Sequence, residues 1–415
     1  MPNEVPSRAV QTLGVVQGDL VTGDSATIKG EGTSPKVTVT GTVHCRGDCT
    51  FECSLSAQSL EGAGYIVVKG DLEIKDLVKI GNGFGFHWGA RERTALVVEG
   101  NVHARTVDVD SKLSVGKDFD AEDVDVGGRL EVRGNTKSQS IDVGGSFSAT
   151  GEVEAQDIDV GGAVSIESKV KIVKLDVGGS AKILGGQVDD IDVGGAFSSK
   201  DSLEFKSIDV GGAVRLAGKN VGGDIDVGGV CKVEGDLQFG DIDVGGVVEI
   251  SGSGKGKSID AGGVVKVGGS LQLEGEMDVG GKVDVGGDLT VYNLDVGGSA
   301  RGKSITATAD VDVGGSIATE SGVSASRVKI GSRGEVIGPI RANEVEIEDR
   351  ARVEDVYART IRMEDHSRAR NLYGEDIRIE SDCQIIGEVQ YTHDLRTESN
   401  IYFAKPPQKV GRLPQ

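Results

Sequence analysis

Aspartate is the residue whose repetition first suggests chemistry in this chain. The motif IDVGG at residues 141–145 returns with small changes along the sequence, so that its aspartate recurs in one slot from Asp108 to Asp312. Stacked carboxylates could hold a ladder of divalent cations, because hard cations prefer oxygen ligands. The ligands of such a ladder would be Asp142, Asp159, Asp176, Asp192, Asp209, Asp226 and Asp243.

A structural role accounts for the same residues without a metal. We expect each carboxylate to accept hydrogen bonds from backbone N–H groups of the Val-Gly-Gly corner that follows it, as in Asx-turns. The pairs Gly144 with Gly145 and Gly161 with Gly162 would then be needed because the corner requires a positive φ. We favour this interpretation, because the repeat lacks the dense glycine-aspartate nonapeptides of calcium-binding β-rolls.

A second group of candidate ligands lies in the run HCRGDCTFEC, which contains Cys45, Cys49 and Cys53 beside His44. The spacing of four residues differs from the C-x2-C pairs of zinc ribbons. The alternation of residue types places all three cysteines on the apolar side, where cysteine behaves as a small hydrophobic residue. We therefore predict core packing and no metal.

Catalytic motifs are missing from the sequence. It contains no G-x-S-x-G, no P-loop and no H-E-x-x-H, and its five histidines fall at different phases of the repeat. We expect no catalytic residues, no cofactor and no enzymatic activity.

Aromatic side chains cluster in one stretch, KIGNGFGFHWGARERT at residues 79–94. Its members Phe84, Phe86, His87 and Trp88 could contact a partner protein, as exposed apolar groups often do. The alternative is a loop that folds back over the side or end of the domain.

The elements that must position these residues follow from the period. The motif aspartates are 17 residues apart, with one step of 16 and one of 18. Apolar and polar residues alternate in three short runs per repeat, which is typical of half-buried strands. In the repeat that starts at Ile141 the apolar positions are Ile141, Val143, Phe147, Ala149, Val153 and Ala155. The pattern predicts an all-β fold, a single-stranded parallel β-helix (β-solenoid) of triangular cross-section with about 17 residues per coil.

The same period predicts the organisation of the chain. We expect a disordered tail at 1–13, irregular solenoid coils at 14–106 with an inserted loop near 79–94, and regular IDVGG coils at 107–327. Coils without glycine pairs follow at 328–393, and a cap with a disordered tail ends the chain at 394–415. Tyr402 and Phe403 are the candidates for covering the last coil.

Composition restricts the partners and the compartment. A net charge of −21 disfavours nucleic acid and anionic membrane surfaces as partners. The chain shows no signal peptide and no window of 18 apolar residues, and its five cysteines suit a reducing compartment better than a disulfide framework. We expect a cytoplasmic protein.

The segment 328–393 resembles the bactofilins, a family of polymer-forming cytoskeletal proteins. The resemblance rests on the cadence of its strands, VKIGS, VEIED, IRMED and IRIES at residues 328, 345, 361 and 377, rather than on a single motif. It implies a right-handed β-helix that assembles end to end into nonpolar filaments without nucleotide. The IDVGG coils have no counterpart in that family, and the solenoid is several times longer than a usual bactofilin core.

These observations define two functional hypotheses. The first is a non-enzymatic, bactofilin-like scaffold that self-assembles through its solenoid ends into dimers, polymers or filaments, because a solenoid end exposes unpaired strand edges. The alternative is a solenoid spacer or binding protein, adhesin-like or partner-recruiting, that does not polymerise. Other proteins would bind it through the tails or the loop at 79–94.

Overall fold

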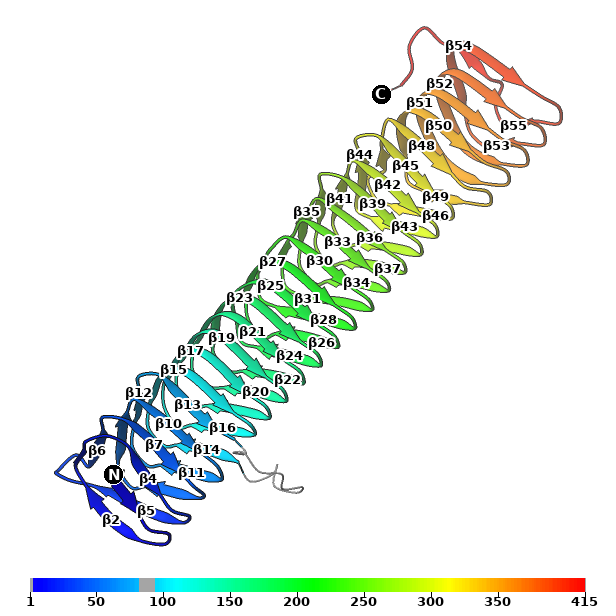
Figure 1. Ribbon diagram of the computed structural model, residues 1–415. Coiled ribbons are helices and arrows are strands. Elements are labelled where there is room, and N and C mark those ends of the chain that lie inside the picture. The colour runs from blue at the N-terminus through cyan, green and yellow to red at the C-terminus, as the bar shows by residue number, and fades with distance from the viewer. Residues whose placement is uncertain (1–2, 82–93, 415) are drawn as a thin grey trace, which may run out of the picture. The chain divides into compact units, whose positions relative to one another are not determined.

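The structure is a computed structural model that describes residues 3–81 and 94–414. This part of the chain forms strands and turns without a helix, so the predicted all-β class is confirmed. No described segment forms an apolar helix of the length that crossing a bilayer requires. The chain divides into two compact units, Met1–Gly211 and Gly212–Gln415, and each is a β-solenoid (Figure 1).

Parallel pairing between successive coils builds both units. Ile141 pairs with Val124 of the coil before it and with Ile158 of the coil after it, which confirms the predicted step of about 17 residues. Each coil contributes strands to three columns, here called faces A, B and C. Face A carries the IDV residues of the motif, face B follows the glycine pair, and face C completes the coil.

In the first unit, face A begins with β1 (Asn3–Val5), β4 (Leu20–Thr22), β7 (Thr42–Cys45), β10 (Ser59–Gly62) and β13 (Leu77–Ile80). Face B consists of β2 (Val10–Leu13), β5 (Ala26–Gly30), β8 (Cys49–Phe51), β11 (Tyr65–Val68), β14 (Ala95–Val98), β16 (Lys112–Val115), β18 (Arg129–Val132), β20 (Ser146–Ala149), β22 (Ala163–Ile166), β24 (Ser180–Ile183) and β26 (Ala196–Ser199). Face C begins with β3 (Val15–Val16), β6 (Lys36–Val39), β9 (Ser54–Ala57) and β12 (Leu72–Ile74). Longer strands then cover faces C and A together: β15 (Val102–Val109), β17 (Phe119–Val126), β19 (Thr136–Val143), β21 (Val153–Val160), β23 (Lys169–Val177), β25 (Gly185–Val193) and β27 (Leu203–Val210).

In the second unit, face A begins with β30 (Asp224–Val227), β33 (Asp241–Val244), β36 (Ser258–Ala261), β39 (Glu276–Val279), β42 (Asn293–Val296), β45 (Asp310–Val313) and β48 (Arg327–Ile330). Face B contains β28 (Ala213–Ala217), β31 (Val230–Glu234), β34 (Val247–Ile250), β37 (Val264–Val267), β40 (Lys282–Val285), β43 (Ser299–Gly302), β46 (Ser316–Thr319), β49 (Glu335–Ile337), β53 (Gln384–Ile385) and β55 (Tyr402–Phe403). Face C contains β29 (Asn220–Val221), β32 (Leu237–Gln238), β35 (Gly254–Gly256), β38 (Leu271–Leu273), β41 (Asp288–Val291), β44 (Ser304–Ala307), β47 (Val323–Ser324) and β56 (Gln408–Lys409). The strands β50 (Ile340–Ile347), β51 (Arg352–Met363), β52 (Arg368–Ile379) and β54 (Val389–Thr397) each turn a corner and contribute to more than one face.

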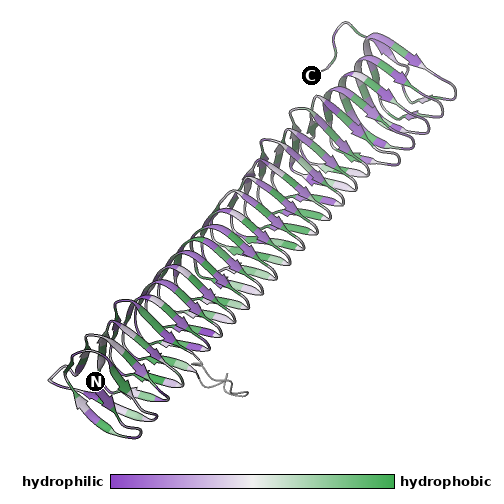
Figure 2. Cartoon of the chain, viewed as in Figure 1, coloured by the Kyte–Doolittle hydropathy of each residue, from purple (hydrophilic) through white to green (hydrophobic). Residues whose placement is uncertain are grey.

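Alternating burial along the strands creates the core of each unit. The inward positions of β20 are Phe147 and Ala149, both buried, and the neighbouring positions point outward. Figure 2 shows this alternation as stripes of hydrophobic and hydrophilic residues along the strands. In β17 the alternation breaks once, at Glu122 and Asp123, where two successive exposed residues carry the chain around the corner from face C to face A.

The glycine pair at the corner between faces A and B is explained by close stacking of the backbone. A Cβ atom on Gly161 would lie 2.5 Å from the carbonyl oxygen of Gly144, one coil below, and Gly162 stands in the same relation to Gly145. None of the four has a positive φ, so the expectation that these glycines supply one was wrong. Glycine is needed because any side chain would overlap the preceding coil.

Positive φ occurs instead at corners that lack the glycine pair. Arg333, Arg350, His366 and Asp382 have φ near 60° (62°, 59°, 59° and 59°), and each lies between the strands of faces A and B. These corners have four residues where the IDVGG corner has two: Glu348 to Ala351, for example, joins the face A and face B stretches of β50 and β51. The extra length turns one small residue, Ala351, back into the core.

Both ends of the chain are more ordered than predicted. Residues 1–13 were expected to be a disordered tail, but Asn3–Val5 and Val10–Leu13 pair with β4 and β5 as the first coil. Likewise, residues in 394–415 form β55 and β56, which pair with β53 and β54. The composition of these segments suggested tails, but hydrogen bonding to the adjacent coil provides a template for them.

The insertion near residues 79–94 falls where the period requires it. Val67 of β11 pairs with Val97 of β14, a step of 30 residues where neighbouring steps take 17. The additional residues lie between β13 and β14, and this stretch includes residues 82–93, outside the described part.

Replacing Gly161 with alanine tests the stacking explanation of the corner. We expect Gly161→Ala to lower stability by about 1–3 kcal/mol, because the new methyl group forces two coils apart. Thermal melts of the variant and of Gly411→Ala, whose Cβ would meet no atom within 4 Å, provide the comparison. Equal melting temperatures for the two variants would contradict the explanation.

Candidate functional site

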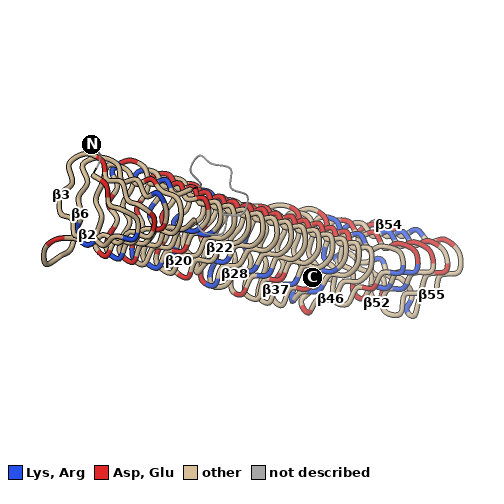
Figure 3. The backbone as a smooth tube through the Cα atoms, turned by 60° about the horizontal axis from the view of Figure 1, so that its bottom comes forward, with Lys and Arg blue, Asp and Glu red and all other residues tan. Residues whose placement is uncertain are grey.

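The motif aspartates form an acidic column on face A of each unit. In the first unit Asp125 pairs with Asp142, which pairs with Asp159, and the series continues to Asp209. In the second unit Asp226 pairs with Asp243, and the series continues to Asp312. Figure 3 shows these positions as a row of acidic residues along the coils. The column is the product of stacking identical outward positions.

The predicted hydrogen bonds from the N–H groups of the glycine corner to these carboxylates are not formed. The corner N–H groups of Gly144 and Ser146 donate instead to the carbonyl oxygens of Val126 and Gly128, one coil below, both at 3.0 Å. Within residues 3–81 and 94–414, no hydrogen bond joins Asp142 or Asp159 to a corner N–H. Stacking therefore satisfies these two donors without the carboxylate.

The carboxylates of the column interact unfavourably with one another. Partial burial, followed by the charges of neighbouring column aspartates, raises the pKa of Asp125, Asp159 and Asp260. Lysines offset the repulsion at a few points: Lys79 Nζ lies 2.6 Å from Asp108 Oδ2, and Lys174 Nζ lies 3.7 Å from Asp176 Oδ2. The repeated negative charge is therefore tolerated by the stack and does not stabilise it.

Hydrogen bonds of the predicted kind, from a corner N–H to a side-chain oxygen, occur at another corner, between faces B and C. Asn135 N–H donates to Asp118 Oδ1 at 2.8 Å, and Glu152 N–H donates to Asn135 Oδ1 at 3.0 Å, each across one coil. Asp71 and Asn101 continue this series in earlier coils. The second unit repeats the arrangement with Asp236, Ser253, Ser270 and Asp288.

These hydrogen bonds were not predicted from the sequence, because the residue type that accepts them varies. Asp, Asn and Ser all supply a side-chain oxygen that accepts a backbone N–H, so no single letter repeats. The available signal was the recurrence of a short polar acceptor in one slot, as at Asp118 and Asn135.

The later coils of the second unit replace the acidic column with paired charges. Lys329 Nζ lies 3.9 Å from Asp312 and 3.1 Å from Glu348, and Arg362 lies 3.3 Å from Glu364. Glu348 and Glu364 belong to the four-residue corners described above, which supply acidic side chains that a glycine pair cannot. Basic residues in the column therefore have partners beside them in these coils.

The cysteine cluster is part of the core. Cys45, Cys49 and Cys53 are buried free thiols, and burial raises the pKa of Cys53 to about 11. His44 points outward instead, with Nδ1 3.3 Å from Glu61 Oε2. No group of three or more His, Cys, Asp or Glu side chains in the described residues converges on a point where a metal ion could bind.

Three predicted features concern partner contacts and the ends. Phe84, Phe86, His87 and Trp88 lie outside the described residues. Tyr402 and Phe403 form β55, which stacks on the preceding coil and pairs with Gln384 and Ile385. Tyr402 is 59% exposed, so the last coil is not covered by it.

Among the described residues, the first coil leaves a row of backbone groups unpaired. Asn3 N–H donates to Asp19, and the carbonyls of Ala9 and Gly14 accept from Thr27 and Thr38 of the next coil. Because successive residues of a strand direct their backbone groups to opposite sides, the residues between them present N–H and C=O groups to the free edge. These residues are Glu4, Val10, Thr12 and Val15. No described strand pairs with this edge, and Val10 and Val15 are 65% and 69% exposed.

The last coil is open in the same way. Tyr402 N–H and Ala404 N–H donate back to Cys383 and Ile385, both at 2.9 Å, so Phe403 presents its backbone groups outward. The inward side chains Leu395 and Phe403 are only partly buried, whereas Ile377 and Ile385 in the preceding coil are buried. Each terminal face thus combines unpaired strand edges with an open section of core.

Comparison with known proteins found no relative. No family model matches the chain, and no curated protein or solved structure is significantly similar to it.

Alanine substitutions at Asp118 and Asp142 distinguish the two kinds of aspartate. We expect Asp118→Ala to lower stability by about 1 kcal/mol, because it leaves the N–H of Asn135 without its acceptor. Asp142→Ala and Asp142→Asn should leave the melting temperature unchanged or raise it, because they remove repulsion and no hydrogen bond. A larger loss at position 142 than at 118 in thermal melts would refute the assignment.

Proposed function

We propose that this chain is a non-enzymatic structural protein that self-associates through its solenoid ends into dimers or polymers without nucleotide. In this proposal it acts in the cytoplasm as a scaffold comparable to the bactofilins. The β-solenoid fold fits a structural scaffold, because its repeated coils give a regular surface and its stability comes from contacts between neighbours.

The observation that carries the proposal is the open edge at each end. Three strands, β1, β2 and β3, present unpaired backbone groups at the first coil, and β54, β55 and β56 do so at the last. Unpaired edges of this kind are templates for pairing with another chain, and proteins that avoid association cover or charge them. Here apolar Val10 and Val15 lie at the free edge, and the aromatic Tyr402 lies at the other end.

The distribution of the histidines supports a non-enzymatic role. His103 faces Asp120, His366 faces Asp349 and His393 faces Asp376, all on the surface and in different coils. Exposed pairs of this kind contribute little to stability.

Proline substitutions in β2 test the proposed end contact. The N–H groups of Val10 and Thr12 point to the free edge, so Val10→Pro with Thr12→Pro removes two outward donors without breaking a bond to β5. We expect the native chain to sediment as larger species with rising concentration and the proline variant to remain smaller. Val10→Ala with Thr12→Ala keeps the donors and should assemble like the native chain.

Two results would contradict the proposal. One is a native chain that sediments as single molecules at every concentration, which would favour the non-polymerising spacer. The other is a proline variant that is folded by circular dichroism and still assembles fully.

A further inference from the structure

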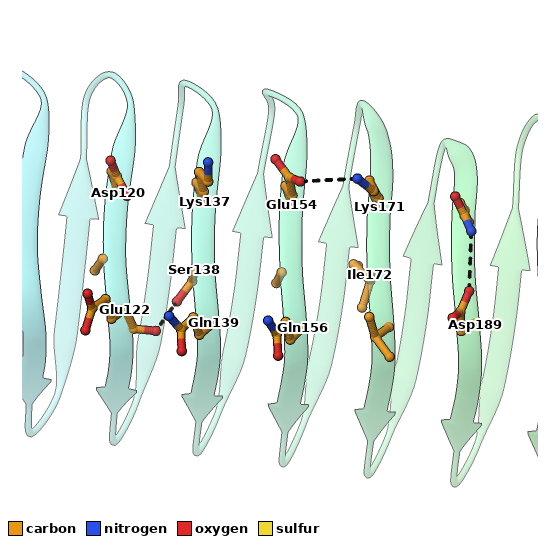
Figure 4. Close-up of a pocket in the computed structure, with 14 residues that line it drawn as sticks. Asp120, Glu122, Lys137, Ser138, Gln139, Glu154, Gln156, Lys171, Ile172 and Asp189 are labelled. Atoms are coloured by element: carbon orange, nitrogen blue, oxygen red, sulfur yellow. Dashed lines mark hydrogen bonds and ion pairs between the residues drawn. The ribbon is translucent and has the colours of Figure 1, made fainter.

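One stretch of face C in the first unit carries charges that alternate in sign from coil to coil. Asp120 pairs with Lys137, Lys137 with Glu154, and Glu154 with Lys171, so that β17, β19, β21 and β23 present the signs minus, plus, minus and plus. We call these four residues the charge ladder. Figure 4 shows their side chains in one line across the strands.

A second, mostly neutral row runs beside the charge ladder. It lies two residues further along each strand and contains Glu122, Gln139, Gln156 and Val173, here called the amide row. The two rows border a hollow of about 530 Å³ that is lined by polar and apolar groups alike. Figure 4 shows the amides of Gln139 and Gln156 beside the ladder.

The ladder charges remain largely in solvent. Glu154 Oε1 lies 3.4 Å from Lys171 Nζ, but the two side chains are 55% and 72% exposed. Lys137 is exposed and forms no ion pair with a described residue. Exposed pairs of this kind contribute little to the stability of the coil itself, so their side chains are free to contact another molecule.

The order of the signs makes the ladder complementary to its own reverse. A twofold axis along the strand direction sets a second copy against the face with its coils in the opposite order. Such an axis keeps the direction of the strands, so the charge ladder faces the charge ladder and the amide row faces the amide row. Asp120 then meets Lys171, and Lys137 meets Glu154, each contact occurring twice.

The centre of the amide row agrees with this arrangement. Gln139 meets Gln156, and amides can hydrogen-bond to each other as donor and acceptor. In the same row Glu122 lies opposite neutral Val173. One coil beyond, Arg105 lies opposite Asp189, and within each copy these two side chains pair with Asp76 and Lys206. Identical coil spacing in both copies keeps the contacts in register.

A parallel arrangement lacks this match. Turning the second copy about an axis along the stack would set the charge ladder against the amide row. Asp120 would then face Glu122, and Lys137 would face neutral Gln139. That orientation gains no ion pair within the ladder and acquires a repulsive contact between like charges.

We propose that a second copy of this chain docks side by side and antiparallel on face C of the first unit, held by the charge ladder. This contact is separate from the end contact of the proposed function and uses no residue of the terminal coils. The hollow between the rows would become a channel that water can fill, as is common at polar interfaces. The contact should weaken as salt is added, because the paired charges lie near the surface.

Charge reversal offers a test in which two defects cancel. Lys137→Glu alone sets two glutamates against each other at both central contacts, and Glu154→Lys alone does the same with lysines. We expect each variant to bind itself at least about tenfold more weakly than the native chain binds itself. A mixture of the two variants restores opposite charges at every rung, so heterodimers should form.

The measurement is retention of an untagged chain by a tagged one on a column, at low salt. Tagged Lys137→Glu should retain more untagged Glu154→Lys than untagged Lys137→Glu, and this difference excludes end contacts, which all variants share. Lys182→Glu, an exposed lysine of β24 on face B, is the matched control and should behave like the native chain. The double variant Lys137→Glu with Glu154→Lys should again bind itself, because its order of signs is also complementary when reversed.

Circular dichroism shows whether each variant is folded before it is compared. Equal retention of the two untagged variants by tagged Lys137→Glu would overturn the lateral contact, whether or not the ends associate. Full assembly of the folded proline variant, with the charge-dependent difference intact, would overturn the proposed function alone.

Discussion

The parallel backbone ladder between successive coils is the interaction on which the rest of each unit depends. A strand of one coil finds its hydrogen-bonding partners in the coils before and after it, as Ile141 does with Val124 and Ile158. This pairing repeats every position of the sequence in a column. The residue type at an outward or corner position therefore recurs in a whole column, and its effect on stability is repeated in every coil of the stack.

The two kinds of corner between faces A and B have different effects on the column of charges. A glycine pair lets successive coils approach so closely that a Cβ would overlap a carbonyl oxygen, as at Gly161. Such a corner is short and carries no charge, so the aspartates beside it have few cations within reach. The four-residue corners use a residue such as Arg350 with positive φ and supply acids such as Glu348. Basic residues in the column then pair with them, and the single-sign column ends.

The sequence predicted the fold correctly because period and alternation both report on the ladder. The register from Val311 through Val328 to Val345 could be read from the spacing of apolar residues, even where the motif disappears. The role of the motif could not be read from the sequence. The prediction was that corner N–H groups donate to Asp142, whereas those of Gly144 and Ser146 donate to the coil below. Contacts between coils cannot be seen within one repeat. The acceptors Asp118 and Asn135 were overlooked because three residue types share that task.

The ends were misjudged for a related reason. Residues 3–13 and 402–409 have the composition of tails, yet each forms strands because the adjacent coil offers an edge to pair with. The same argument applies to the outermost strands, whose own edges remain unpaired. In the proposed assembly, a second copy pairs with these edges.

Hydrogen exchange of the first coil tests this account most directly. The amides of Glu4, Val10, Thr12 and Val15 face the free edge and should exchange rapidly in dilute protein. If end pairing occurs, the same amides become protected as the concentration rises, while inward-bonded amides such as that of Thr27 stay protected throughout. Rapid exchange of the edge amides at every concentration would contradict assembly through the ends.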